Sequence, residues 1–126
     1  MKLLRVSLTD IRSYHKRTFE FHTGLTVIIG ANTAGKTNIL ESIYVASYGK
    51  SFRAVKDSDM VAWGSEVGHI DVVADHEEDE RRLRVTVTSG MVNGQKAQTK
   101  KYLVNGIPRR STDFIGQLKT ALFAHS

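Results

Sequence analysis

The sequence contains no cysteine and only one proline among its 126 residues. Without cysteine the chain forms no disulfide and has no thiolate for metal binding or nucleophilic catalysis, and nothing in this composition points to secretion. No apolar run approaches the roughly 20 residues that a membrane-spanning helix needs, and the N-terminus lacks a hydrophobic region long enough for a signal peptide. We therefore expect a cytoplasmic protein.

Length and charge narrow the possibilities further. A chain of 126 residues with 40% hydrophobic residues forms one domain, or part of a larger one. Residues 1–56 carry nine basic and three acidic residues, residues 57–80 nine acidic and no basic ones, and residues 81–126 nine basic and one acidic. Such blocks are explained either by solvated loops and strand edges, or by a basic surface for a polyanion with an acidic projection elsewhere.

The most specific motif is Gly30–Thr37, which fits the phosphate-binding pattern G-x-x-x-x-G-K-S/T at every fixed position. The apolar, β-branched run Leu25–Ile29 precedes it and predicts a buried strand. A helix is predicted to follow and to end at Gly49. This strand-loop-helix context favours a phosphate site over a glycine-rich turn that matches by chance. The residues that share one face of the helix are Ile39, Leu40, Ile43, Tyr44 and Ser47.

Each fixed position of the motif has a physical role. Gly30 and Gly35 allow a tight turn that brings backbone N–H groups close to phosphate oxygens. The helix directs its N-terminus, with free N–H groups and a positive dipole, at the same anion. Lys36 can reach the β- and γ-phosphates, and the Thr37 hydroxyl can bind Mg²⁺ that also keeps phosphate oxygens as ligands.

The N-terminal residues predict a hairpin ahead of the motif. Apolar and polar residues alternate over Lys2–Thr9, which predicts a half-buried strand. The polar stretch Asp10–Arg17 breaks the alternation and predicts a loop. Phe19 and Phe21 resume it, in a strand that ends at Thr23–Gly24.

The residues after Gly49 predict further strands and short helices. Antiparallel strands are expected at His69–Ala74 and Leu83–Thr88, joined by an acidic hairpin tip, Asp75–Glu80. The fold class expected is therefore α/β, a phosphate-binding strand-loop-helix with an antiparallel β-rich part. One or two helical turns are predicted in Asp57–Trp63 and a loop at Ser89–Gln98. A strand is predicted at Lys100–Val104, followed by a tight turn at Asn105–Gly106 and an edge position for Pro108. The last predicted element is a helix capped by Ser111 or Thr112, whose inward side chains are Phe114, Ile115, Leu118 and Leu122.

Other candidate sites are weaker. Val72–Asp75 imitates a Walker B strand, but Asp71 interrupts the apolar run and an acidic hairpin tip follows, so we reject this assignment. The five histidines do not pair at metal-ligand spacing, and no structural metal is expected. Arg12 could touch phosphate and Tyr14 could stack on a base; from these residues alone, a surface charge and a core anchor are the simpler interpretations.

The order of these features resembles the RecF family of bacterial recombination and repair ATPases, which are related to SMC proteins. The resemblance is carried in patches over nearly the whole chain, and Gly49–Arg53 is more specific to the family than the phosphate-binding loop. Asp10 stands where the family has asparagine, and Thr33 stands where glycine or alanine is common. The segments that carry the resemblance are Asp10–Tyr14, Gly24–Asn32, Gly35–Ile43, Gly49–Arg53, Val104–Pro108 and Leu122–Phe123.

The resemblance implies an ABC-type ATPase head, here an N-terminal part spanning residues 1–126, with ATP and Mg²⁺ as cofactors. Two heads of this family close around two ATP molecules and bind DNA, single-stranded or gapped, with RecO and RecR. These proteins help to load recombinase in DNA replication, repair, recombination and the SOS response. DNA contacts are predicted at Lys50, Arg53 and Lys56. The nucleotide residues implied are Gly30, Ala31, Asn32, Thr33, Ala34, Gly35, Lys36, Thr37, Asn38 and Arg12, with Thr37 on Mg²⁺.

Several parts of a complete ATPase head are missing from this sequence. It has no signature motif, no Walker B aspartate and no catalytic glutamate, so catalytic residues are not assigned. ATPase activity is implied for a full-length protein, whereas this chain alone is expected to bind ATP without hydrolysing it. Two alternatives remain at this point: another SMC-like head, such as an overcoming-lysogenization-defect ATPase, and a small P-loop phosphotransferase.

Overall fold

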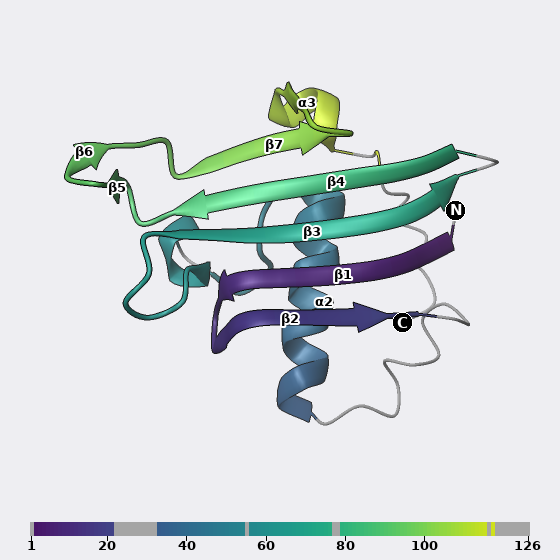
Figure 1. Ribbon diagram of the computed structural model, residues 1–126, viewed down its shortest axis with the longest axis horizontal. Coiled ribbons are helices and arrows are strands. Elements are labelled where there is room, and N and C mark those ends of the chain that lie inside the picture. The colour runs from purple at the N-terminus through teal and green to yellow at the C-terminus, as the bar shows by residue number, and fades with distance from the viewer. Residues whose placement is uncertain (1, 22–32, 55, 77–78, 116, 118–126) are drawn as a thin grey trace.

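A six-stranded antiparallel sheet forms the body of the protein (Figure 1). The computed structural model describes residues 2–21, 33–54, 56–76, 79–115 and 117. Within them, each strand pairs antiparallel with its neighbours. In spatial order the strands are β2 (Tyr14–Glu20), β1 (Lys2–Ile11), β3 (Val67–His76), β4 (Asp79–Thr88), β7 (Lys100–Val104) and β8 (Ile107–Arg109).

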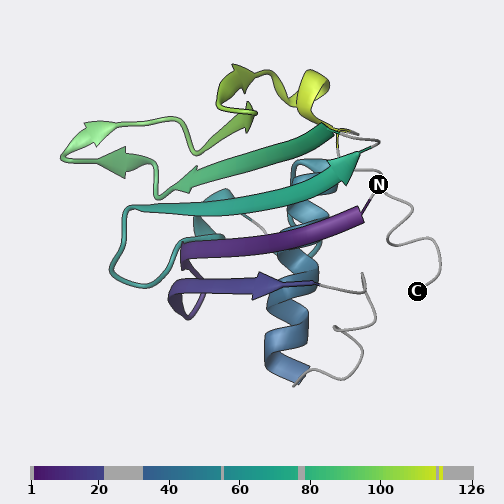
Figure 2. The ribbon, with the colours of Figure 1, turned by 45° about the vertical axis from the view of Figure 1, so that its right-hand side comes forward.

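One long helix, α2 (Thr33–Tyr48), crosses one face of this sheet at a steep angle to the strands (Figures 1 and 2). Alternation along the strands turns every second side chain toward the helix, as in Leu83, Val85 and Val87 of β4, which are all buried. The other face of the sheet carries polar side chains, so the fold has one apolar layer between sheet and helix. Core residues from the helix are Ile39, Ile43, Val45 and Ala46.

Short elements lie at the edges and ends of the sheet. The 3₁₀ turn η1 (Asp57–Met60) lies beside the end of β1, where Ile11 forms an isolated bridge with Val61. A small hairpin of β5 (Met91–Val92) and β6 (Gln95–Lys96) projects from the end of β4. The one-turn helix α3 (Ser111–Phe114) packs on β7, with the rings of Tyr102 and Phe114 4.8 Å apart. No described helix is long and apolar enough to cross a membrane.

The sequence predicted the antiparallel part well. The strands expected at Lys2–Thr9, His69–Ala74, Leu83–Thr88 and Lys100–Val104 are confirmed, each within a slightly longer or equal element. The tight turn is confirmed as well, because Asn105 and Gly106 both have positive φ, 51° and 81°. The helix end at Gly49 is confirmed by its φ of +80°. The edge position of Pro108 and the helical turn at 57–60 are also confirmed.

The predicted loop at Asp10–Arg17 is wrong. Strand β1 continues to Ile11 and β2 begins at Tyr14, so the turn is only Arg12–Ser13, with Arg12 at a φ of +53°. The polar residues His15–Arg17 fit a strand because β2 is an edge strand and these side chains are exposed, whereas Tyr14 and Phe19 pack against the core. Similarly, the loop expected at Ser89–Gln98 contains the β5–β6 hairpin.

The C-terminal helix also differs from the prediction. It starts at Ser111 with Arg110 as the N-cap residue, and no side chain makes the capping hydrogen bond. Phe114 is buried as expected, whereas Ile115 is 46% exposed because it lies just after the single turn. The predicted inward residues Leu118 and Leu122, and the predicted strand Leu25–Ile29, lie outside the described residues.

Gly68 is required by close packing rather than by its backbone angles. A Cβ atom at this position would lie 2.5 Å from the carbonyl oxygen of Asp10 and 2.7 Å from Cδ1 of Ile11. The oxygen cannot move easily, since it accepts a hydrogen bond of 2.8 Å from the Ala62 backbone N–H. This contact holds the segment after η1 against the end of β1.

We predict that Gly68→Ala destabilises the protein by about 1–3 kcal/mol, the usual cost of overpacking a core. Urea unfolding measures the change. Gly64→Asn is the control, because Gly64 has a φ of +85° and a Cβ there would meet nothing within 4 Å, and asparagine tolerates this conformation. Equal stability of Gly68→Ala and the parent protein would contradict the packing argument.

Candidate nucleotide-binding site

The predicted phosphate-binding motif coincides with the start of α2. The backbone of Thr33–Thr37 forms the first residues of this 16-residue helix, while Gly30–Asn32 lie outside the described residues. The first four N–H groups of a helix have no partner within it, and the helix dipole makes this end positive. The first turn contains no acidic residue that would compensate that charge. The helix start therefore fits an anionic group.

A buried carboxylate lies one turn further along the helix. The Glu41 side chain is only 1% exposed and accepts five hydrogen bonds. Arg12 donates two of them, from Nε at 2.9 Å and Nη2 at 2.6 Å, and Arg53 donates another two, from Nε at 3.0 Å and Nη2 at 3.1 Å. The fifth comes from the Ser51 hydroxyl at 2.6 Å. These bonds join the β1–β2 turn, α2 and the segment after α2.

The segment after α2 is held by the same residues. Ser51 Oγ accepts hydrogen bonds of 3.0 Å from the backbone N–H groups of Arg53 and Ala54, which fixes a tight local turn. Arg53 Nη2 also donates to Asn38 Oδ1 at 2.5 Å. Asn38, which the sequence assigned to the nucleotide, therefore contacts Arg53 directly. We call Arg12, Asn38, Glu41, Ser51 and Arg53 the Glu41 cluster.

The position of Arg12 follows from the tight hairpin turn. Its backbone N–H donates to the Met60 carbonyl at 2.9 Å, so η1 supports the turn from outside. The side chain then points at α2 and remains 24% exposed. Hydrogen bonds to Glu41 raise the pKa of the Arg12 guanidinium despite its partial burial. Arg12 is thus a permanent cation beside the helix that begins with the phosphate-binding motif.

The cluster sets the ionisation of Glu41. Burial alone would raise its pKa, but the hydrogen bonds from Arg12, Arg53 and Ser51 outweigh burial and lower the pKa from 4.5 to about 2. The carboxylate is therefore charged at all physiological pH values, and two arginines against one carboxylate leave the cluster with a net positive charge.

The chain matches known proteins over almost its full length. Residues 5–121 match the family model of the AAA domain. This chain belongs to the AAA domain family.

The resemblance of this AAA domain to RecF is also confirmed. DNA replication and repair protein RecF of Macrococcus caseolyticus (strain JCSC5402) is 33% identical over 124 residues, and that of Clostridium novyi (strain NT) is 33% identical over 125; each match covers 98% of this chain. The chain spans about a third of the length of these relatives, 32% and 33%.

Solved structures agree with the fold. The recombination mediator protein RecF-ATPrS of the RecFOR pathway superposes with a TM-score of 0.70 at 26% identity, covering 91% of this chain and 30% of that one. A structure of the recombination mediator protein RecF-ATP in the RecFOR pathway gives a TM-score of 0.64 at 26% identity, covering 88% of this chain and 28% of that one. The SMC head domain from Thermotoga maritima gives 0.61 at 18% identity, covering 90% and 40%, and supports the fold. The expected head-type fold is therefore confirmed.

The three predicted DNA contacts of this AAA domain differ in their surroundings. Lys50 and Lys56 are exposed, whereas Arg53 is turned toward Glu41 with 35% of its side chain exposed. Between them, Phe52 is 51% exposed, and its ring lies edge-on to Tyr44 at 5.3 Å. Lys50 and Lys56 are thus accessible to a polyanion in solution, while Arg53 is held in the Glu41 cluster.

The imitation of a Walker B strand does not line the site. Asp75 is exposed on β3, an antiparallel strand, and pairs in register with Glu80 of β4. The rejection of this residue as a Mg²⁺ ligand is consistent with its position. Among the described residues, no group of three or more His, Asp or Glu side chains is arranged to hold a metal ion.

Sequence reasoning missed Glu41 and Ser51. Their role depends on partners 29 and 10 residues from Glu41, which no local pattern reveals. One feature of the sequence could have indicated a special role for Glu41. It is the only acidic residue between Thr33 and Tyr48, in a helix whose other buried residues include the core side chains Ile39 and Ile43.

We predict that the stability of the protein falls at acidic pH because of Glu41. Its pKa is lower in the folded state, so its contribution is complete above pH ~4.5 and is lost as pH falls toward 2. The expected loss between pH 7 and pH 3 is roughly 2 kcal/mol. Urea unfolding at both pH values measures it, with Glu41→Gln expected to show a smaller pH dependence than the parent protein. An identical pH dependence in Glu41→Gln would contradict the assignment.

Proposed function

We propose that this chain is the ATP-binding part of a RecF-type DNA repair and recombination ATPase. The single observation that carries the proposal is that Thr33–Thr37, the last five residues of the G-x-x-x-x-G-K-T motif, form the start of α2, where free N–H groups and the helix dipole favour an anion. The proposal is further supported by the similarity to RecF, including the structures described as RecF-ATP and RecF-ATPrS.

The roles within the site follow from residue chemistry. The backbone of Gly30–Thr37 would cradle the phosphates, and Lys36 would neutralise the β- and γ-phosphate charge. Thr37 would supply a hydroxyl ligand to Mg²⁺, which when bound neutralises phosphate charge. Arg12 would add a second cation near the nucleotide, since it is already anchored to α2 through Glu41.

The wider biology belongs to the same proposal. A RecF-type protein would act in the cytoplasm on single-stranded or gapped DNA, together with RecO and RecR, and would dimerise in an ATP-dependent way. Residues 1–126 would be one partial head domain. Lys50 and Lys56 would belong to the DNA-facing surface, because exposed basic side chains release counterions when they contact phosphates, and the partly exposed Arg53 would lie at its border.

A P-loop phosphotransferase is less well supported. The nucleotide helix here is covered by an antiparallel sheet in which β1 and β2 precede the motif. The similarity of the whole fold to the RecF and SMC head structures favours the ATPase head instead.

We predict that Lys36→Ala weakens Mg-ATP binding about ten- to hundred-fold, because a charge-assisted contact is worth roughly 1.5–3 kcal/mol. Isothermal titration calorimetry measures the affinity. Lys50→Ala is the matched control, since it removes a lysine at the opposite end of α2 and should leave ATP binding unchanged. Equal affinities for Lys36→Ala and the parent protein would refute the nucleotide site.

We further predict that the chain binds ATP without hydrolysing it. Phosphoryl transfer needs an oriented water and stabilisation of transition-state charge in addition to bound phosphates and Mg²⁺. The sequence offers no carboxylate suited to orient the water, because Asp75 is exposed on an antiparallel strand. Mg-ATP should raise the melting temperature by mass action, while phosphate release stays at the buffer rate at any protein concentration. Turnover that Asp75→Asn abolishes would instead identify β3 as a Walker B strand.

A further inference from the structure

The Glu41 cluster contains more positive charge than burial of one carboxylate requires. A buried carboxylate needs a partner, and one bidentate arginine supplies it. Here two arginines, from the β1–β2 turn and from the segment after α2, both make bidentate contacts with Glu41. The five residues of the cluster therefore carry a net charge of +1, beside the middle of α2.

Both arginines also retain unused donors. Each contacts Glu41 through Nε and Nη2, and within the described part of the chain Nη1 of neither arginine donates a hydrogen bond. A guanidinium has five N–H donors, so a further anion can be recognised without breaking the contacts to Glu41. The carboxylate thus fixes the orientation of the two guanidinium groups and leaves Nη1 of each available, since Nη2 of Arg53 already donates to both Glu41 and Asn38.

The Glu41 cluster lies close to the phosphate-binding motif along α2. Asn38, which accepts from Arg53, directly follows Thr37 in sequence, and Glu41 is four residues beyond Thr37 on the same helix. With a rise of about 1.5 Å per residue, these are separations of about 1.5 and 6 Å along the helix axis. Arg53 is therefore held against the first turns of α2.

We propose that Glu41 is a positioning residue that holds Arg53, together with Arg12, where their charge favours a nucleoside triphosphate over a diphosphate. This inference rests on the proposed nucleotide site at the start of α2. A triphosphate carries one more negative charge than a diphosphate, so fixed guanidinium groups near the terminal phosphate strengthen binding of the triphosphate more. Ser51 contributes by holding both the carboxylate and the turn that presents Arg53.

If the Glu41 contacts only stabilise the fold by joining three chain segments, a different result is expected. Loss of the tie would lower the stability of the whole fold and would affect both nucleotides alike. The ratio of ATP affinity to ADP affinity separates the two cases, because a general loss of stability cancels from that ratio.

The test is a double-mutant cycle of Arg53→Gln and Glu41→Gln, with calorimetric affinities for Mg-ATP and Mg-ADP. We expect Arg53→Gln alone to lower the ATP to ADP preference about tenfold, the effect of one charge-assisted hydrogen bond. In the Glu41→Gln background the same change should lower it less than about threefold, because Arg53 is no longer held in place. Ser51→Ala replaces Glu41→Gln in the cycle if the latter does not fold, with the same direction expected.

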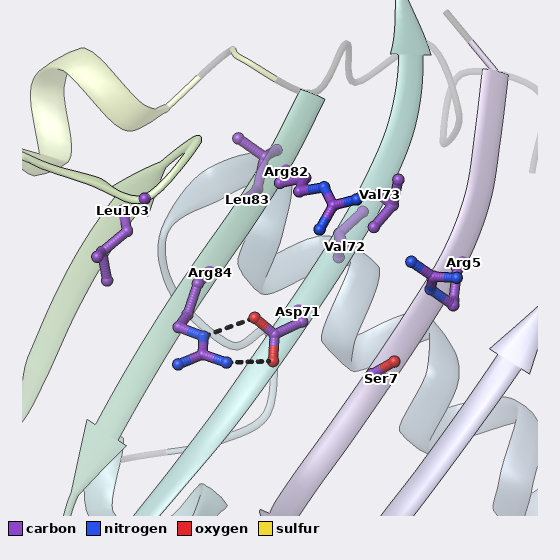
Figure 3. Close-up of a pocket in the computed structure, with 10 residues that line it drawn as sticks. Arg5, Ser7, Asp71, Val72, Val73, Arg82, Leu83, Arg84 and Leu103 are labelled. Atoms are coloured by element: carbon purple, nitrogen blue, oxygen red, sulfur yellow. Dashed lines mark hydrogen bonds and ion pairs between the residues drawn. The ribbon is translucent and has the colours of Figure 1, made fainter. Parts of the chain in front are cut away.

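The control is an ion pair of the same kind away from the helix. Arg84 contacts Asp71 through Nε at 2.6 Å and Nη2 at 3.3 Å, on the open face of the sheet beside Arg5 and Arg82 (Figure 3). Asp71→Asn should leave the nucleotide preference unchanged.

Two results would overturn the inference: an unchanged preference in Arg53→Gln, or the same fold-change in both backgrounds. In either case, nucleotide binding that still depends on Lys36 would leave the proposed function intact. Absence of binding of either nucleotide to the parent protein would refute the proposed function itself.

Discussion

The contact of Glu41 with Arg12 and Arg53 determines how the parts of this fold meet. Apolar packing covers one face of α2 with the sheet, but it does not fix the hairpin turn at Arg12 or the segment at Ser51–Arg53. The buried carboxylate does so with five hydrogen bonds, and removing it would leave two arginines without their partner. Because the helix that carries Glu41 begins with the phosphate-binding motif, the same contact links the fold to its site.

The two faces of the sheet serve different purposes. One face packs on α2, and the other is polar and carries a shallow hollow of about 380 Å³ around Val73, bordered by Arg5, Arg82 and the Asp71–Arg84 pair. Exposed pairs of this kind contribute little to stability, since water screens them. The Glu41 carboxylate, in contrast, is only 1% exposed, so water screens its contacts with the two arginines less. This difference in exposure is why the cluster, and not the hollow, is assigned a role with the nucleotide.

Local patterns predicted much of the fold and little of the cluster. The alternation in Leu83–Thr88, the Asn105–Gly106 turn and the stop at Gly49 are properties of a few neighbouring residues, so the sequence reveals them. The first part of the edge strand β2, from Tyr14 to Arg17, was missed because solvent-facing polar residues resemble a loop. The partners of Glu41 were missed because they come from segments 12 and 29 residues away, and only the folded chain brings them together. Arg53, predicted as a DNA contact from its charge, faces α2 for the same reason.

We propose that a nucleotide binds at the start of α2, beside the Glu41 cluster. Chemical-shift mapping by NMR, with Mg-ATP added to the isotopically labelled protein, tests it directly. We expect shift changes at the backbone amides of Thr33–Asn38 and at the Nε–H groups of Arg12 and Arg53, with the β5–β6 hairpin unaffected. Changes confined to the open face of the sheet, at Arg5, Arg82 and Arg84, would contradict it.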